Sequence, residues 1–456
     1  MDTIVAISTA PGVGGIGIIR MSGKKCFDVL DKIFKQRKKQ EIENIKGYSM
    51  KYGHIIDKDK QEIIDEVLVS YFKEPYSYTT ENMCEINSHG GIIIMRRILE
   101  LCLNNGAKMA EPGEFTKRAF LNGRIDLSQA EAIIDIINSK TEKESKASIN
   151  QLEGFLSRDI RSIRDKVLDV MSDIEASIDY PEYDIEEITN GKILKVLQDV
   201  KEQLEKLEST FYNGKIIKEG IKVAIIGKPN AGKSSLLNAM LKENRAIVTE
   251  YEGTTRDTIE EFIDIDGIPI KIIDTAGIRN ARDQVEQIGI KKAKEIAIDA
   301  DIVIAIFDIT RTLDDEDEKI LKLIKEKRAI IVLNKIDLGE KEIDNKILEA
   351  QKPIVRISAR EKVGIEELNK EISNIFKLQE INFSGETLVT NVRHKKSIQE
   401  ALENTYKAIK TLEDNMPIDI IGIYIKEILE CLGDITGENV SENIINEIFS
   451  KFCLGK

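Results

Sequence analysis

Apolar positions in the first quarter of the chain form short runs between polar or glycine-rich segments, instead of one long periodic pattern. Residues 91–103 are expected to form a helix, and strands are expected at residues 2–8, 18–20, 66–72 and 84–87. The glycine-rich loop at residues 11–17 leads into a strand and lacks a Lys-Ser pair, so we do not interpret it as a nucleotide-binding loop. This part of the chain is therefore predicted to be α+β.

The apolar period changes at about Ser128, where apolar residues begin to recur every three or four positions. That spacing is typical of an amphipathic helix face, and it continues to Phe211 with a break at Pro181. Further helices are expected at residues 398–412, 423–432 and 443–449. Because helical patterns flank a different central stretch, we expect one helical bundle domain made of two chain segments, with another domain inserted into it.

The central stretch alternates short β-branched runs with helical patterns, which predicts a doubly wound and mostly parallel sheet. A hairpin that turns at Asp266 and Gly267 adds one antiparallel edge strand. The remaining strands are expected at residues 221–226, 302–307, 329–333 and 354–357. The fold class is thus multidomain α/β and α, with domains expected at residues 1–119, 120–217, 218–379 and 380–456.

Composition excludes several classes of protein. The 456 residues are 41% hydrophobic and 32% charged, as in ordinary globular proteins. No run approaches the roughly 18 apolar residues of a membrane span, and the N-terminus lacks the basic start of a signal peptide, so a cytoplasmic location is expected. The five cysteines are scattered and form no Cys-x-x-Cys pair, which, with only three histidines, argues against a zinc centre.

Residues 227–235 read Gly-Lys-Pro-Asn-Ala-Gly-Lys-Ser-Ser and lie between a predicted strand and a predicted helix. This order fits the phosphate-loop pattern G-x-x-x-x-G-K-[ST]. Backbone N–H groups of such a loop face the phosphates, while Lys233 is expected to reach the terminal phosphates and the Ser234 hydroxyl to bind Mg²⁺. The nucleotide-binding residues expected here are Asn230, Ala231, Gly232, Lys233, Ser234 and Ser235.

Four further motifs follow in a fixed order and identify the base as guanine. The Asp337 carboxylate can accept two N–H donors from guanine N1 and N2, a donor pair that adenine lacks. Thr255 is expected to supply a second Mg²⁺ ligand from a switch segment, and Asp274 to hold the ion through water. The residues of these motifs are Thr254, Thr255, Asp274, Thr275, Ala276, Gly277, Asn334, Lys335, Asp337, Ser358, Ala359 and Arg360. Together they predict a Ras-like P-loop GTPase domain.

The water-positioning group of this predicted GTPase differs from that of Ras. In Ras-like enzymes a glutamine follows the switch glycine, whereas Gly277 is followed here by Ile278, which has no polar side chain. Asn230, inside the phosphate loop, either stabilises that loop or binds a monovalent cation beside the phosphates. A cation at this place would supply the charge that an arginine finger supplies elsewhere.

The whole chain resembles the MnmE/TrmE family of bacterial tRNA modification GTPases. Outside the GTPase motifs, the terminal Cys-Leu-Gly-Lys is the most specific feature of this resemblance. The resemblance rests on residues 3–6, 14–20, 88–91, 112–124, 126–132, 253–257 and 452–456. It implies an N-terminal folate-binding domain that dimerises, a helical domain from two segments and an inserted G domain.

The resemblance also implies a reaction and its partners. GTP hydrolysis would be activated by K⁺-dependent pairing of two G domains in a homodimer. Together with the FAD-binding MnmG/GidA protein, in a heterotetramer, the family adds a carboxymethylaminomethyl-type group to C5 of the wobble uridine of certain tRNAs. A folate, 5-formyl-tetrahydrofolate or a related species, would carry the one-carbon unit, and FAD would belong to the partner and not to this chain.

Position by position, the resemblance assigns further site residues. Glu286 matches the carboxylate that orients the hydrolytic water through a second water. Arg124 stands where the family pattern is Lys, which keeps the charge but changes the geometry. Cys453 is either a reactive thiol or a small packed residue. The implied K⁺ ligands are Asn230, Thr249, Tyr251 and Thr254, with Thr249 also at the GTP site, and the implied folate contacts are Arg20, Glu85, Arg124 and Lys456.

Three functions remain open from the sequence: a tRNA-modifying GTPase, a GTP-switched ribosome or RNA assembly factor, and a folate-dependent methyltransferase regulated by its GTPase. The flanking Arg20 and Glu85 and the terminal motif favour the first. The formal net charge of −13 does not indicate nucleic-acid binding. Residues 1–119 are nearly neutral, however, so this domain or the partner protein is expected to provide the surface that meets tRNA.

Overall fold

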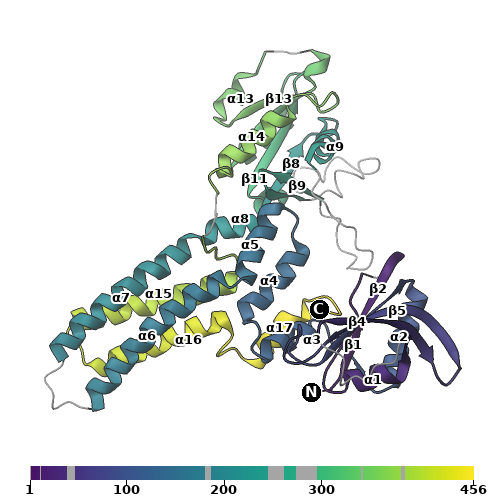
Figure 1. The fold of residues 1–456 in the computed structure, drawn as a ribbon. Helices are drawn as coiled ribbons and strands as arrows, with labels where there is room; N and C mark the ends of the chain where they lie inside the picture. Colours follow the sequence, from purple (N-terminus) through teal and green to yellow (C-terminus); the bar gives the residue numbers. More distant parts are fainter. Residues whose placement is uncertain are drawn as a thin grey trace. The chain divides into compact units, whose positions relative to one another are not determined.

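The computed structural model describes residues 2–10, 12–37, 47–179, 186–244, 261–273, 295–339, 342–381 and 386–456. The chain forms two compact units. The first joins Met1–Ile134 with Leu429–Lys456, and the second is Asp135–Ile428. Among the described residues, none of the helices combines the length and the apolar character needed to cross a membrane. The ribbon of each unit can be followed in Figure 1.

The first unit contains a seven-stranded sheet in the order β3-β4-β5-β6-β2-β1-β7. Every described pair of neighbours is antiparallel except β1 and β7, which are parallel. Buried residues of helices α1 (Cys26–Ile33) and α2 (Ile92–Asn104) form one core with the strands. The strands are β1 (Ile4–Ile7), β2 (Gly14–Ser22), β3 (Phe34–Gln36), β4 (Ser49–Asp57), β5 (Glu62–Phe72), β6 (Met83–Gly90) and β7 (Lys108–Met109). The α+β prediction is confirmed.

The glycine-rich segment before Ile18 is not only a loop, because β2 already begins at Gly14. Gly14 pairs with Gly90, and Gly17 pairs with Ser88 across an irregular register. A Cβ atom on Gly90 would lie 2.4 Å from the carbonyl oxygen of Gly14. The two backbones are too close for side chains here. This close packing accounts for the glycines, so no nucleotide-binding role is needed to explain them.

The C-terminal segment belongs to the first unit and packs on helix α3 (Glu114–Leu121). Gly113, just before α3, has φ +69°, and a Cβ atom there would lie 2.6 Å from the carbonyl oxygen of Phe449. The Phe449 ring lies 5.2 Å from Phe452 and 6.3 Å from Phe120, centroid to centroid. Helix α17 (Glu442–Ser450) is thereby fixed to α3, so the end of the chain is held near its beginning.

The second unit contains a six-stranded sheet in the order β13-β12-β11-β8-β10-β9. All neighbours are parallel except the edge strand β9, which pairs antiparallel with β10. The turn residues Asp266 and Gly267 both have positive φ, as a tight hairpin turn requires. The strands are β8 (Ile221–Gly227), β9 (Glu261–Ile265), β10 (Ile268–Ile273), β11 (Ile302–Asp308), β12 (Ala329–Asn334) and β13 (Ile354–Ile357). The doubly wound prediction is confirmed.

Alternate residues of the central strands enter two cores, one on each face of this sheet. Helices α9 (Lys233–Asn244) and α14 (Ile365–Phe376) bury their apolar residues on one face. Helices α12 (Asp315–Ile324) and α13 (Asn345–Glu349) cover the other. Strands buried on both faces leave functional groups only at their ends and in the loops, which is where the motifs lie.

Helices that precede this sheet in the chain pack against helices that follow it, within the second unit (Figure 1). Gln399 of α15 donates to Glu208 of α7 over 2.6 Å, and the Val389 N–H donates to the Thr210 hydroxyl over 3.1 Å. A helical bundle built from two chain segments is thus confirmed. Its helices are α5 (Glu142–Leu152), α6 (Phe155–Asp179), α7 (Glu186–Ser209), α8 (Phe211–Glu219) and α15 (Val392–Glu413), while α4 (Leu127–Asn138) and α16 (Ile418–Thr436) each have residues in both units.

Candidate functional site

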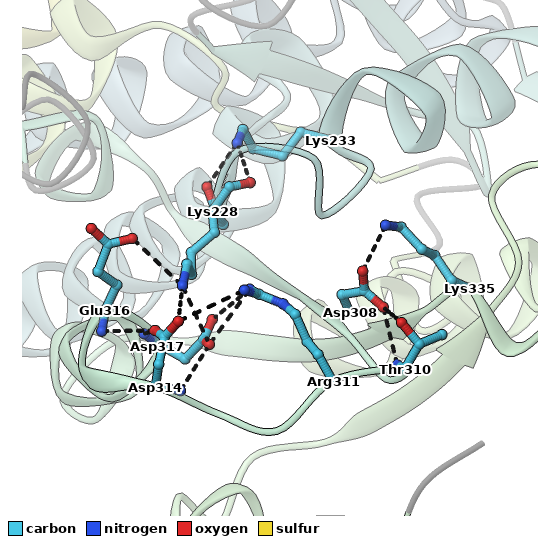
Figure 2. A network of polar contacts seen from close by, with 10 residues as sticks. Lys228, Lys233, Asp308, Thr310, Arg311, Asp314, Glu316, Asp317 and Lys335 are labelled. Atoms are coloured by element: carbon cyan, nitrogen blue, oxygen red, sulfur yellow. Dashed lines mark hydrogen bonds and ion pairs between the residues drawn. The ribbon is translucent and has the colours of Figure 1, made fainter. Parts of the chain in front are cut away.

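The phosphate loop connects the end of β8 at Gly227 to the start of α9 at Lys233. The Lys233 ammonium donates to the backbone carbonyl of Gly227 over 2.7 Å and to that of Lys228 over 2.8 Å (Figure 2). Burial lowers the pKa of Lys233 from its usual value. The charged lysine is therefore held against the loop's own carbonyls, at the place where the motif expects terminal phosphates.

Two residues of this loop require unusual backbone conformations. Asn230 has φ +62°, a region that Asn tolerates better than most residues. Gly232 has φ +104°, and a Cβ atom there would lie 2.1 Å from the side-chain nitrogen of Asn334. Only glycine fits at position 232, because any side chain would displace the amide that supports the loop.

The Asn334 side chain joins three of the predicted motifs. Asn334 is 2% exposed. Its amide nitrogen donates to the carbonyl of Ala231 over 2.8 Å, and its amide oxygen accepts from the Ala359 N–H over 3.0 Å. Both contacts are buried, so each satisfies a group that water cannot reach. The phosphate loop, the end of β12 and the loop after β13 therefore form one connected structure.

The residues expected to bind guanine are positioned by their neighbours. Lys335 has φ +74°, and its ammonium lies 2.6 Å from Oδ2 of Asp308, at the end of β11. The Ser358 hydroxyl donates to Oδ1 of Asp337 over 2.6 Å. These contacts attach Lys335 and Asp337, which both follow β12, to Asp308 and Ser358 at the ends of the neighbouring strands β11 and β13, at the edge of the sheet where a base is expected to be recognised.

The other expected nucleotide residues divide into two groups. Ser234 and Ser235 lie in the first turn of α9, and Arg360 is exposed with its Nε 3.8 Å from Oε1 of Glu361. The rest lie outside the described residues, so the structure gives no geometry for them. These are Thr249, Tyr251, Thr254, Thr255, Asp274, Thr275, Ala276, Gly277, Ile278 and Glu286. No group of three or more His, Cys, Asp or Glu in the described part of the chain could hold a metal ion.

A second cluster lies in the first unit and contains the residues expected to bind folate. Arg20 of β2 and Glu85 of β6 are directly opposite in the sheet register. Arg20 Nε and Nη2 lie 2.9 and 2.8 Å from Oε1 of Glu85, and Nη1 donates to the Gly455 carbonyl over 3.2 Å. Arg20 therefore joins the sheet to the C-terminal segment, which brings Lys456 to the same place.

The ring of Tyr78 forms one wall of this cluster. The Arg124 guanidinium lies 4.5 Å from the Tyr78 ring centroid, and that of Arg20 lies 5.4 Å away. The pKa of Lys456 is lowered, first by burial and then by the positive charge of Arg20. Arg20, Arg124 and Lys456 thus lie in one cluster with Glu85 and the Tyr78 ring, an arrangement of cations and an aromatic ring that suits an anionic ligand with a flat ring.

The structure brings together all four residues expected at the folate site, and it adds contacts that the sequence did not predict. Tyr78 donates to or accepts from the Thr116 hydroxyl over 2.8 Å, which orients its ring. Nothing in its sequence context singles Tyr78 out. Cys453 is exposed, and its carbonyl accepts from the Gly113 N–H over 3.4 Å. In the second unit, Asp308 was missed although it directly follows the strand predicted at residues 302–307.

Comparisons with known proteins agree over the full length. The family model for the MnmE helical domain matches residues 127–453, and the model for the GTP-binding protein TrmE N-terminus matches residues 3–124. The tRNA modification GTPase MnmE of Acetivibrio thermocellus is 49% identical over 458 residues, covering 100% of this chain and 99% of the relative. That of Finegoldia magna is 50% identical over 457 residues, covering 100% of both chains.

Proposed function

Because the chain belongs to the MnmE family of tRNA modification GTPases, we propose that its GTP hydrolysis supports a modification at C5 of the wobble uridine of certain tRNAs. The group added is of the carboxymethylaminomethyl type, built together with an FAD-binding MnmG/GidA-type partner. The proposed binding of GTP is supported by the buried Asn334 amide. This side chain, at the end of β12, connects the phosphate loop at Ala231 to the loop after β13 at Ala359. The tRNA part rests on the family.

For the nucleotide site, we propose that Ser234 and Thr255 hold Mg²⁺. The ion supplies charge neutralisation between the phosphates when it is bound. Ser234 begins α9 next to Lys233, which is the place where a phosphate-loop hydroxyl meets the ion. Lys233, Asn334 and Asp337 then hold the terminal phosphates, the loop and the guanine respectively.

We further propose that Asn230 takes part in a K⁺ site shared with Thr249, Tyr251 and Thr254, and that Glu286 orients the attacking water. Asn230 is exposed and has φ +62°, and its side-chain amide oxygen is a suitable ligand for a hard cation. Two G domains of a homodimer would pair around this cation. Hydrolysis is then expected to be faster in KCl than in NaCl, and Asn230→Ala is expected to remove the difference. Equal rates for the unchanged protein would refute the K⁺ site.

In the first unit, we propose that Arg20, Glu85, Arg124 and Lys456 bind 5-formyl-tetrahydrofolate or a related folate. A folate offers a flat pterin ring and a carboxylate tail. The Arg20 and Lys456 cations beside Glu85, and the Tyr78 ring 4.5 Å from the Arg124 guanidinium, support this assignment. Cys453 is proposed as a thiol that takes part in the chemistry, since it is exposed and lies three residues from Lys456.

We propose that the chain is divided into domains at residues 119, 217 and 379 and that the N-terminal domain forms the homodimer. The active complex is a heterotetramer with the FAD-binding partner. Because its substrate is tRNA, the protein is proposed to act in the cytoplasm.

One experiment tests the proposed function. Wobble-uridine nucleosides of tRNA from cells that lack the protein are compared with those of the parent strain by mass spectrometry. Loss of the C5-modified uridines, restored by the unchanged gene, is the expected result. Unchanged nucleosides together with accumulated ribosome precursors would instead favour a GTP-switched assembly factor.

A further inference from the structure

The side chain of Lys228 attaches the phosphate loop to helix α12. Lys228 follows Gly227 and is mostly buried, with a side-chain exposure of 13%. Its ammonium contacts Asp314 directly, and lies 3.6 Å from Oε2 of Glu316 and 3.9 Å from Oδ2 of Asp317 (Figure 2). These three carboxylates are the N-cap and first-turn residues of α12. One cation of the phosphate motif is thus paired with another element of the domain.

Hydrogen bonds to backbone N–H groups hold the carboxylates of Asp314 and Asp317 in place at the start of α12. Asp314 accepts N–H bonds from Glu316 and Asp317 over 3.0 and 3.3 Å, and Asp317 accepts the Asp314 N–H over 3.2 Å. The hydrogen bond from Lys228 is the first cause that lowers the pKa of Asp314 to about 2. Asp314 is therefore a carboxylate at neutral pH, and the helix dipole favours its charge at this end.

Asp317 is 1% exposed, and a buried carboxylate is stable only when cations or N–H groups face it. Arg311 lies on its other side, with Nη2 3.3 Å from Oδ1 of Asp317. Burial raises the pKa of Asp317, while the charges of Arg311 and Lys228 oppose that change. Lys228 and Arg311, together with the Asp314 N–H, therefore offset part of the negative charge at this end of the helix.

The backbone of Lys228 is the point at which the phosphate loop closes on itself. Its carbonyl accepts the Lys233 ammonium over 2.8 Å and the Ala231 N–H over 3.3 Å. The Lys233 ammonium has three N–H donors, so the third can meet a phosphate while both carbonyl contacts remain. The pairing of Lys228 with α12 does not depend on Lys233, so the side chain of residue 228 can hold the loop in place whether or not a phosphate is bound.

The segment between β11 and α12 supports the base end of the site in the same way. Asp308 at its start binds Lys335 over 2.6 Å and accepts the Thr310 N–H and hydroxyl over 3.0 and 2.7 Å. Figure 2 shows Lys335 and Lys228 attached to the two ends of this segment. Residues 308–317 thus contact both the phosphate loop, through Lys228, and the segment expected to bind the base, through Lys335.

We propose that Lys228 is a positioning residue for the nucleotide, whose ion pairs with Asp314, Glu316 and Asp317 hold the phosphate loop in its GTP-binding shape without contact between Lys228 and the phosphates. The inference rests on the proposed GTP site and names a residue that the phosphate-loop motif leaves unspecified. A direct contact between Lys228 and phosphate would predict the opposite change in GTP affinity when Asp314 is neutralised. If Lys228 bound phosphate, neutralising Asp314 would free it and strengthen binding.

The test uses the full-length protein, a fluorescent GTP analogue for affinity, and steady-state hydrolysis for kcat and KM. Lys228→Met, which keeps length and removes charge, is expected to weaken affinity about fivefold to tenfold, tenfold being roughly 1.4 kcal/mol. The substitution is expected to raise KM for GTP and to leave kcat within about twofold of the unchanged protein. The reason is that the loop binds GTP equally well in the ground state and in the transition state. Lys228→Arg is expected to restore most of the affinity.

Asp314→Asn removes the charge and keeps a good N-cap, so the helix is retained. It is expected to weaken affinity in the same direction, and the double variant with Lys228→Met is expected to lose no more than the larger single loss. Glu318→Gln is the matched control, because Glu318 lies in the same first turn but pairs with Lys346. Its affinity is expected to equal that of the unchanged protein.

Three results would overturn the inference: a Lys228→Met affinity within twofold of the unchanged protein, a gain of affinity in Asp314→Asn, or additive losses in the double variant. A lower melting temperature with unchanged affinity would show a purely structural ion pair and would also overturn it. If the unchanged protein itself fails to bind GTP, the proposed function fails instead, so the two failures are distinguishable.

Discussion

Asn334 and Ala231 are joined by a buried hydrogen bond of 2.8 Å, from the side-chain amide of Asn334 to the backbone carbonyl of Ala231. The two residues are 103 positions apart in the chain. The same amide accepts the Ala359 N–H, so one side chain fixes the phosphate loop relative to two loops at the base end. The resemblance and the GTPase expected from the sequence are confirmed by the family comparisons, and this bond is the physical connection between their motifs.

Asn334→Ala is expected to be more damaging than loss of one contact to a base. It leaves the Ala231 carbonyl and the Ala359 N–H buried without their partner, which at about 1–3 kcal/mol for each group costs about 2–6 kcal/mol of folding free energy. GTP affinity is expected to fall by at least about tenfold. Asn334→Asp keeps the acceptor for Ala359 but places a carboxylate against the Ala231 carbonyl, so it is not expected to rescue. Calorimetric titration showing near-normal affinity in Asn334→Ala would contradict this role.

Gly232→Ala is expected to abolish tight GTP binding. The residue has φ +104°, and the added Cβ would lie 2.1 Å from the Asn334 side-chain nitrogen, so strain and collision act together. Gly191→Ala in α7 is the matched control, since a Cβ there meets nothing within 4 Å. The control is expected to gain about 0.5–1 kcal/mol in unfolding experiments and to bind GTP normally. Equal GTP affinities for the two variants would show that the close approach at residue 232 has no consequence.

Arg20→Ala is expected to weaken folate binding by more than about tenfold while GTP hydrolysis without tRNA stays unchanged. The substitution removes two hydrogen bonds to Glu85 and one to the Gly455 carbonyl, so it releases the C-terminal segment that carries Lys456. Arg97→Ala is the control, because Arg97 forms a similar pair with Glu62 in the same unit. Calorimetry with a reduced folate is the measurement, and equal losses in the two variants would argue for a general effect on the fold.

His89 gives the first unit a pH-dependent contact. Its Nδ1 lies 2.7 Å from Oδ1 of Asp65, and this hydrogen bond, with the charge of Asp65, raises the pKa of His89 above 6.5. A raised folded-state pKa stabilises the fold fully below the unfolded value, and the stabilisation is lost as the pH rises through the folded value. Asp65→Asn is expected to lower the pKa of His89 in an NMR titration. An unchanged titration curve in that variant would contradict the assignment.

How much the sequence predicts differs between the two units. The central strands of the second unit, such as β11 (Ile302–Asp308) and β12 (Ala329–Asn334), are almost wholly apolar and are buried on both faces. This strong pattern allowed their positions to be predicted within a few residues. In the first unit, β4 (Ser49–Asp57) alternates weakly and is mostly half-buried, and it was not predicted. One-sided antiparallel strands with polar residues give a weaker pattern than buried parallel strands.

The sites show the same contrast. Asn334, Lys335 and Asp337 were identified because their motif has fixed spacing at a strand end. Lys228 was not identified, since its role depends on Asp314, which is 86 residues away. Tyr78 was missed for the same reason, as only the fold brings its ring next to Arg124. Long-range contacts of this kind leave no local signal in a single sequence.

We propose that GTP hydrolysis in the second unit drives modification of the wobble uridine, and complementation tests this most directly. Cells that lack the protein are supplied with the unchanged gene, with Lys233→Ala or with the Glu318→Gln control, and their tRNA nucleosides are quantified by mass spectrometry. The C5-modified uridines are expected to return with the unchanged gene and with Glu318→Gln, and to stay absent with Lys233→Ala, whose protein level matches theirs. Full modification with Lys233→Ala, in a protein shown not to hydrolyse GTP, would contradict a dependence of the modification on GTP hydrolysis.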